Sequence, residues 1–153
     1  MKLELDLQVA TTETDVPDIR LLQDWLRVAL AGEREQAELT IRIVDRDEGM
    51  ALNERWRGRQ GPTNVLSFPA EGLEEQVPDL LGDIIICAPV VRREAAEQHK
   101  PLLAHWAHLV VHGGLHLLGY DHVEAHQAQI MEQKEIEILA QLGFPDPYRE
   151  QGE

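Results

Sequence analysis

The sequence predicts a single α+β domain, in which a mixed four-stranded sheet is covered by about five helices. The chain has 153 residues, which is a common length for one domain. Its content of 43% hydrophobic and 27% charged residues is ordinary for a globular protein. Segments with alternating apolar residues are interleaved with segments of helical periodicity, which is typical of a sheet covered by helices.

Four segments have the character of strands. Residues 3–9 and 39–43 alternate apolar with polar side chains, which indicates strands with one buried face. Residues 64–68 are rich in β-forming side chains, and residues 83–88 form a β-branched run that we expect at the centre of the sheet. Residues 69–82 contain four acids among glycines and prolines, so we expect a loop there.

Five segments carry helical periodicity or helix boundary signals. Proline stands at the start of three of them, and glycine follows the end of four. Asp45 and Glu48 flank the start of the second helix with the spacing of a capping box. We expect helices over residues 17–31, 46–57, 101–118 and 123–142, and a further helix that begins at residue 89.

The chain lacks the sequence features of membrane, secreted and fibrous proteins. No apolar stretch approaches the roughly 18 residues that span a bilayer. The first nine residues alternate leucine with charged or polar residues, so we expect no signal peptide. The single cysteine, Cys87, cannot form an internal disulfide, as is usual in a reducing compartment. We therefore expect a cytoplasmic protein with no membrane partner.

The net charge is −14, which opposes binding to free nucleic acid. The acids are unevenly distributed, because residues 55–70 contain none. That stretch holds Arg55, Arg57 and Arg59. It is either a solvated surface strip or a phosphate contact, since the arginine fork suits bidentate phosphate binding.

All seven histidines lie within residues 99–126. His112 and His116 are four residues apart, so on a helix both imidazoles share one face and can reach one metal ion. Gly119 can adopt a left-handed conformation that turns the chain and returns His122 to the same point. Three histidines leave one position open on a tetrahedral zinc ion, which is typical of a catalytic site.

Three neighbouring residues have alternative interpretations. His105 and His108 share a helical face with His112. We interpret both as core residues or as support for the ligands, with the alternative that His108 replaces one ligand. Asp121 is a candidate partner for the second ring nitrogen of a ligand and equally a candidate capping residue.

The spacing H-x3-H-x5-H also matches the metzincin proteases. Their signature requires a glutamate directly after the first histidine as the general base, and Gly113 stands at that position. The motif therefore retains the metal geometry and disfavours peptidase chemistry of that type.

Three motifs resemble those of the YbeY family of bacterial endoribonucleases. Residues 112–122 read HGGLHLLGYDH, against a family pattern of HG-x-LHL-x-GYDH. Residues 52–68 contain LNERWR followed by PTNVLSF, and residues 81–84 read LGDI, both similar to family motifs in the same order. The resemblance covers essentially the whole chain.

The resemblance implies a metal-dependent, single-strand-directed endoribonuclease that acts in ribosomal RNA processing, with 16S rRNA 3′-end maturation and ribosome quality control as its roles. It implies the small ribosomal subunit and associated assembly proteins as partners, and one Zn²⁺ per chain. By motif position, it implies His112, His116 and His122 as zinc ligands and Arg57 as the catalytic residue.

Some positions depart from the family pattern. Asn64 stands where many members have aspartate, and Gln60 and Gly61 stand where charged residues are common. These departures leave the predicted metal site intact. In the resulting hypothesis, zinc lowers the pKa of a water to about 7, and Arg57 neutralises charge on the phosphate. The sequence shows no general base, so either water or the RNA 2′-hydroxyl is the nucleophile.

Two other functions remain open at the level of sequence. A non-nucleolytic ribosome assembly factor would hold a structural zinc with an occupied fourth position, for example by His108. Another zinc hydrolase, such as a peptidase, would carry a carboxylate that faces the zinc-bound water.

Overall fold

Four strands and five helices form the part of the chain that the computed structural model describes, residues 1–57 and 63–149. The side chain of Arg57 lies outside this description. The elements confirm the predicted α+β domain, and none of the described helices is long and apolar enough to cross a membrane. The elements are β1 (Lys2–Ala10), α1 (Ile19–Leu30), β2 (Gln36–Val44), α2 (Arg46–Arg57), β3 (Val65–Pro69), β4 (Leu80–Cys87), α3 (Ala88–Glu97), α4 (Leu102–Leu117) and α5 (Ala125–Gln141).

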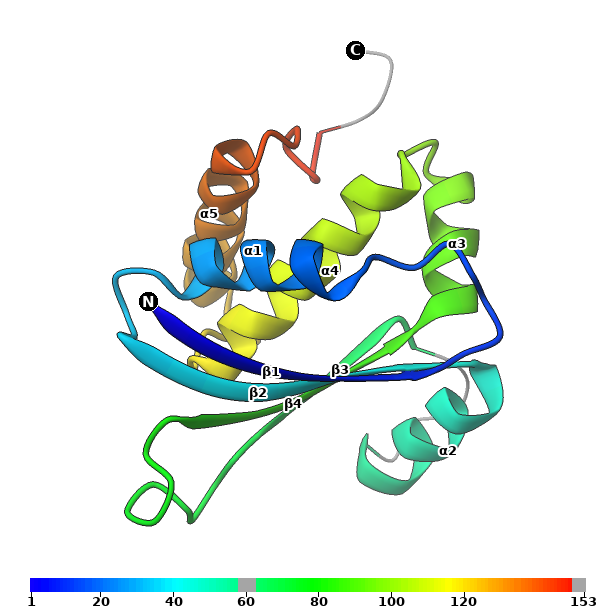
Figure 1. Cartoon of the computed structure of the whole chain (residues 1–153). Coiled ribbons are helices and arrows are strands. Elements are labelled where there is room, and N and C mark those ends of the chain that lie inside the picture. Colours follow the sequence, from blue (N-terminus) through cyan, green and yellow to red (C-terminus); the bar gives the residue numbers. More distant parts are fainter. Residues whose placement is uncertain (58–62, 150–153) are drawn as a thin grey trace.

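The sheet has the strand order β1-β2-β4-β3 and mixes two kinds of pairing. β1 pairs with β2 and β2 with β4 in parallel, whereas β3 pairs with β4 in antiparallel orientation. The predicted β-branched run is part of β4, which is a central strand as expected. Helices α1, α3, α4 and α5 lie on one face of the sheet, and α2 lies on the other face at one end (Figure 1). Much of that second face is therefore not covered by any of the described helices.

Helix α4 packs between the sheet and its neighbouring helices, and most of its side chains, including Trp106, are buried. Two adjacent glycines allow this close packing. A Cβ atom at Gly113 would lie 3.0 Å from the Cγ2 of Ile84 in β4, and one at Gly114 would lie 3.3 Å from the Cδ2 of Leu26 in α1. The helix that carries the histidine motif is therefore held from two sides.

Two strands begin earlier than the sequence predicts. β2 begins at Gln36 rather than at residue 39. β4 begins at Leu80, so the loop predicted over residues 69–82 is shorter than expected. Gly82 indicates a loop in the sequence, but it lies inside β4 with a φ of 138°. A Cβ atom there would lie 2.1 Å from the carbonyl oxygen of Phe68 in β3. The glycine thus permits close approach of two backbones, which is its other common use in strands.

Helix α2 forms where it is predicted, but the two acids of the expected capping box have other partners. Asp45 accepts hydrogen bonds from Thr11 and Thr12 in the segment after β1. Glu48 accepts two hydrogen bonds from the guanidinium of Arg42 in β2. These acids therefore fasten the start of α2 to the parallel edge of the sheet.

Candidate metal centre

The C-terminal half of α4 carries two histidines on the same side of the helix. The Nε2 atoms of His112 and His116 are 3.1 Å apart. Two nitrogens bound to one tetrahedral zinc ion at about 2.0–2.1 Å are separated by about 3.3 Å. The two imidazoles are therefore close to the spacing that a shared zinc ion requires.

A Schellman turn ends α4 and returns the third histidine. Gly119 has a φ of 103°, and its N–H and that of Tyr120 each donate at 3.0 Å to carbonyl oxygens of the last helical turn. The ring centre of His122 then lies 4.8 Å from that of His116 and 5.5 Å from that of His112. One ring nitrogen of each histidine lies within 4.8 Å of the others. The structure thus brings the three predicted ligands together.

Hydrogen bonds to the opposite ring nitrogens orient two of these imidazoles. The Nδ1 of His116 lies 2.9 Å from the carbonyl oxygen of Tyr120, and the Nδ1 of His112 lies 2.8 Å from the Glu135 carboxylate. Since both partners accept, each Nδ1 carries the proton and each Nε2 keeps its lone pair. Neutral imidazole with a free Nε2 is a form that binds zinc, so these residues fit Zn²⁺.

His116 has a strongly perturbed environment. Burial, followed by the charges of His112 and His122, lowers the pKa of His116 to about 4. A metal ligand must be an unprotonated imidazole. At neutral pH this ring therefore offers a lone pair without first losing a proton.

Glu135 of α5 is a fully buried partner of the three-histidine cluster, and it lies outside the motifs that predict the site. Its Oε1 accepts from His112, and its Oε2 lies 2.7 Å from the Nε2 of His108 and 2.6 Å from the hydroxyl of Tyr148. Burial acts to raise the pKa of Glu135, but the bonds from His108 and His112 outweigh it and hold the pKa at about 2. The carboxylate is therefore charged at neutral pH.

The amphipathic pattern of α5 contains a signal for Glu135. Met131, Ile138 and Leu139 form its buried stripe, and Glu135 occupies a position between them. An acid inside an apolar stripe is buried and needs bonding partners. The identity of those partners depends on how α5 packs on α4, which spacing along the chain does not provide.

His108, His112 and Glu135 form a second group of potential ligands that shares His112 with the first. Their separations of 2.7 and 2.8 Å are those of hydrogen bonds between imidazole and carboxylate. His112 faces Glu135 through Nδ1, so its Nε2 remains directed toward His116. The structure therefore places His108 beside Glu135 and apart from the three-histidine cluster.

Asp121 has a backbone partner rather than an imidazole partner in the structure. Its Oδ1 accepts from the N–H of His122 at 2.6 Å and from that of Val123 at 3.2 Å. These bonds cap backbone N–H groups of the loop before α5 rather than the helix itself, whose N-cap is Glu124. They stabilise the returning loop that carries His122.

His105 belongs to a separate buried group. Its Nε2 lies 3.0 Å from Oε1 of Glu94 in α3, and the amide of Asn64 donates to the same oxygen at 3.0 Å. An ionised aspartate at position 64 has no proton to donate. At the position of the departure from the family motif, Asn64 therefore donates a hydrogen bond to Glu94, which links the residue before β3 to α3 and α4.

Position 113 faces the sheet. A Cβ atom there would lie 3.0 Å from Ile84 and 3.3 Å from the Oγ of Ser67. In metzincins this position supplies the general base. In this chain the space beside position 113 is filled by the sheet, so a peptidase of that type has no room for its glutamate.

The end of α2 presents an exposed aromatic ring beside arginine. Trp56 is 59% exposed and packs edge-on against Phe68, with ring centres 6.4 Å apart. The guanidinium carbon of Arg55 lies 5.1 Å from the centre of the Trp56 ring, a cation–π contact. Arg57 is the last residue of α2. Its side chain, and Arg59 within residues 58–62, lie outside the described part of the structure.

Strand β3 joins the end of α2 to the metal centre. Phe68 contacts Trp56, while the hydroxyl of the adjacent Ser67 lies 3.4 Å from the carbonyl oxygen of Gly113. Gly113 directly follows the predicted ligand His112. The basic stretch and the histidine cluster are therefore connected through two consecutive residues of one strand.

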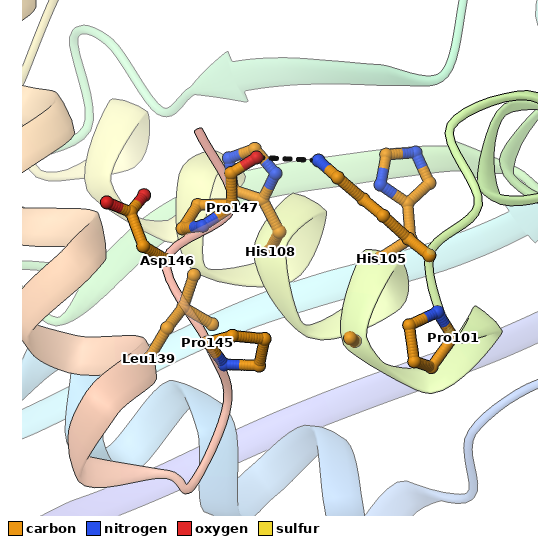
Figure 2. Close-up of a pocket in the computed structure, with 9 residues that line it drawn as sticks. Pro101, His105, His108, Leu139, Pro145, Asp146 and Pro147 are labelled. Atoms are coloured by element: carbon orange, nitrogen blue, oxygen red, sulfur yellow. Dashed lines mark hydrogen bonds between the residues drawn. The ribbon is translucent and has the colours of Figure 1, made fainter. Parts of the chain in front are cut away.

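A small pocket lies between α4 and the segment after α5 (Figure 2). His105, His108 and Pro147 line it, and the Nζ of Lys100 donates to the carbonyl oxygen of Pro147 at 2.6 Å. Its volume of about 20 Å³ is enough for one water molecule. The pocket is too small for a nucleotide and so is not a substrate site.

Comparisons with known proteins agree with the motifs. The family model described as endoribonuclease YbeY matches residues 7–143. The endoribonuclease YbeY of Methylococcus capsulatus is 58% identical over 148 residues, which cover 97% of this chain and 97% of that protein. A solution structure from Thermotoga maritima has a TM-score of 0.61 at 24% identity, covers 96% of this chain and 99% of its own, and shows the same fold. The chain belongs to the YbeY endoribonuclease family.

Proposed function

We propose that this chain is a zinc-dependent endoribonuclease that cuts single-stranded RNA during ribosomal RNA processing in the cytoplasm. Its roles are 16S rRNA 3′-end maturation and ribosome quality control. One zinc ion per chain is held by His112, His116 and His122, and Arg57 acts on the scissile phosphate. Residues 1–153 form a single catalytic domain.

The observation that carries this proposal is the arrangement of the three imidazoles. Two Nε2 atoms face each other at 3.1 Å, and both Nδ1 atoms are bonded to acceptors that fix the ring orientation. Among the described residues, the cluster contains three histidines and no carboxylate, which would leave a coordination position for water or phosphate on a tetrahedral ion. Membership in a family of endoribonucleases supports RNA as the substrate.

The chemistry divides between the ion and the protein. Zinc supplies a positive charge for a phosphoryl oxygen and lowers the pKa of water to about 7. Arg57 neutralises negative charge that develops on the phosphate in the transition state. Glu135 does not act as the general base, because it is fully buried and both its oxygens are bonded.

The sheet face opposite the helical layer supports docking on basic proteins. Asp6 and Asp83 are exposed and lie in one register row with Thr40 between them. Glu4 and Glu38 are directly paired in a neighbouring row, and desolvation together with Glu4 raises the pKa of Glu38. This concentration of negative charge repels free RNA and attracts positively charged protein. We infer that ribosomal RNA is presented by the small ribosomal subunit and associated assembly proteins that contact this face.

The two alternative functions have less support. A structural zinc needs a fourth protein ligand, but His108 lies 2.7 Å from Glu135 and is not in the three-histidine group. A peptidase of the metzincin type needs a glutamate at position 113, where the sheet occupies the space. The open three-histidine site of a nuclease is the better match.

The test is RNA cleavage by metal-free protein to which zinc is returned. Purified protein is treated with a chelator and assayed on a labelled single-stranded RNA and on the corresponding duplex. We expect no cleavage without metal, recovery at one equivalent of zinc, and preference for the single strand. Undiminished cleavage by protein shown to be metal-free would contradict the proposal.

A pair of histidine variants provides the matched control. His126, near the start of α5, is exposed and lies outside the cluster. His122→Ala should lose zinc-dependent cleavage, whereas His126→Ala should retain it. The same assay with purified small subunits tests the proposed ribosomal partner. We expect ribosomal RNA to be cleaved faster within the subunit than as free RNA.

A further inference from the structure

We propose that Glu135 is the positioning residue of His112, and that Tyr148 in the segment after α5 holds Glu135 in place. This inference rests on the proposed metal centre and adds two residues that lie outside the histidine motif. The segment after α5 would therefore contribute to zinc affinity through Tyr148.

The contact between Glu135 and His112 determines which ring nitrogen of His112 is free. Oε1 of Glu135 accepts from Nδ1 of His112 at 2.8 Å. The proton is therefore on Nδ1, and the lone pair of Nε2 is directed toward His116 at 3.1 Å. A charged acceptor also increases the basicity of the opposite nitrogen, which strengthens its bond to a metal ion.

The second oxygen of the carboxylate has its own donors. Oε2 of Glu135 lies 2.6 Å from the Tyr148 hydroxyl and 2.7 Å from Nε2 of His108. A fully buried carboxylate is stable only when such donors replace water. The three partners thus bind both oxygens of Glu135 and hold its carboxylate against His112.

Two contacts outside the network fasten the segment that carries Tyr148. Phe144 packs edge-on against Trp25 of α1, with ring centres 6.0 Å apart. The Nζ of Lys100 donates to the carbonyl oxygen of Pro147, directly before Tyr148, at 2.6 Å (Figure 2). The tyrosine hydroxyl is therefore delivered to Glu135 by a segment with a defined path.

The same residues permit a different hypothesis, in which His108, His112 and Glu135 bind a second ion. His112 would then have to give both ring nitrogens to metal ions. The positioning role requires one zinc per chain, and the second site requires two. Metal stoichiometry therefore separates the two hypotheses.

The experiment measures zinc affinity by competition with a chromogenic chelator, together with the absorption spectrum of the cobalt-substituted protein. Glu135→Gln should raise the zinc Kd by about 10- to 100-fold, as for other partners of metal-bound histidine. Tyr148→Phe removes one of the three hydrogen-bond donors to Glu135 and should raise the zinc Kd by about 3- to 10-fold. Both variants should alter the cobalt spectrum while the metal-free protein melts within a few degrees of wild type.

Glu137→Gln is the matched control, because this acid lies on the same helix but is exposed. It should leave the zinc Kd unchanged. Two results would overturn the proposal. One is wild-type zinc affinity in both Glu135→Gln and Tyr148→Phe. The other is two zinc ions per wild-type chain, one of which is lost in Glu135→Gln. If Glu135→Gln does not fold, Tyr148→Phe decides alone. His116→Ala tests the metal centre separately: loss of zinc there, with unchanged affinity in the other two variants, contradicts only the positioning role.

Discussion

The candidate metal centre and the exposed end of α2 differ in how the protein holds their side chains. At the metal centre, His112 and His116 each have a hydrogen-bonded Nδ1, and the carboxylate behind His112 is fully buried. At the end of α2, Trp56 is 59% exposed and contacts the edge of Phe68 and the guanidinium of Arg55. Two of the three histidines are oriented by the protein itself, whereas the exposed His122 and the Trp56 ring lie largely in solvent.

From this difference we expect the two regions to have different roles, metal binding at the three-histidine cluster and RNA contact at the end of α2. A partner on the second ring nitrogen orients a metal-binding histidine, and the protein supplies such partners to His112 and His116. A side chain that contacts RNA can be ordered by the substrate and contributes through charge or stacking. Changes at the centre should therefore alter metal affinity, and changes at the end of α2 should alter RNA cleavage or binding while metal content and stability stay the same.

Arg57→Ala should give the largest effect at the α2 end. Loss of one group that stabilises transition-state charge lowers turnover by about 100- to 1000-fold. Because Arg57 ends a helix, zinc content and melting temperature should remain close to wild type. Single-turnover cleavage, elemental analysis and thermal melting measure the three quantities. A large fall in melting temperature would instead identify Arg57 as part of a structural ion pair.

Trp56→Ala should have a smaller effect, on binding rather than on the chemical step. Stacking of a base on an aromatic side chain contributes about 1–3 kcal/mol. The Kd for a short single-stranded RNA should therefore rise by about 5- to 160-fold, measured by fluorescence anisotropy. Trp56→Phe keeps an aromatic face and should bind nearly as well as wild type. Equal affinity of Trp56→Ala and wild type would remove Trp56 from the substrate contact.

The salt dependence of RNA binding should be shallow. The chain has a net charge of −14 and a single acid-free basic stretch with three arginines. With two or three phosphate contacts, at about −0.7 each for a single strand, the logarithmic salt slope should be near −2. A salt series with free protein tests this, and a slope much steeper than −2 would show that the contact extends beyond the α2 end.

Glu94→Gln should have the smallest effect, on stability alone. Burial acts to raise the pKa of Glu94, but bonds from His105 and Asn64 lower it below its usual value. A lowered carboxylate pKa stabilises the fold above the unfolded pKa of about 4.3, and this contribution is lost as the pH falls below it.

The variant should therefore lose about 1 kcal/mol of unfolding free energy at pH 7 and approach wild type in acid. Urea unfolding at several pH values measures the difference. Zinc content should not change, since neither Glu94 nor His105 belongs to the three-histidine cluster. A deficit that persists undiminished at acidic pH would contradict the charged role of Glu94.

The fold was largely predictable because each element has a local signal. Alternation, prolines and glycines were sufficient to place the strands and helices in order, as the structure confirms. The start of β4 was not predictable from these signals. Position 82 requires glycine because the backbone of Phe68 lies beside it. Such a contact between strands cannot be predicted from the neighbouring residues in the sequence.

The candidate site shows the same limit. The spacing of His112, His116 and His122 predicts a cluster because a helix and a glycine turn are local structures, and the structure brings these residues together. Glu135 and Tyr148 reach the cluster only through packing of α5 and the segment after it. Their contacts depend on tertiary structure, so local spacing could not identify them.

The most direct test of the metal centre is the zinc content of purified wild-type protein and of His116→Ala, measured by elemental analysis on equal amounts of folded protein. The Nε2 of His116 lies 3.1 Å from that of His112, and the Nδ1 of His116 is hydrogen-bonded to the carbonyl oxygen of Tyr120. The prediction is one zinc ion per wild-type chain and a loss of most of it in the variant. Equal zinc content in the two proteins would contradict the three-histidine site.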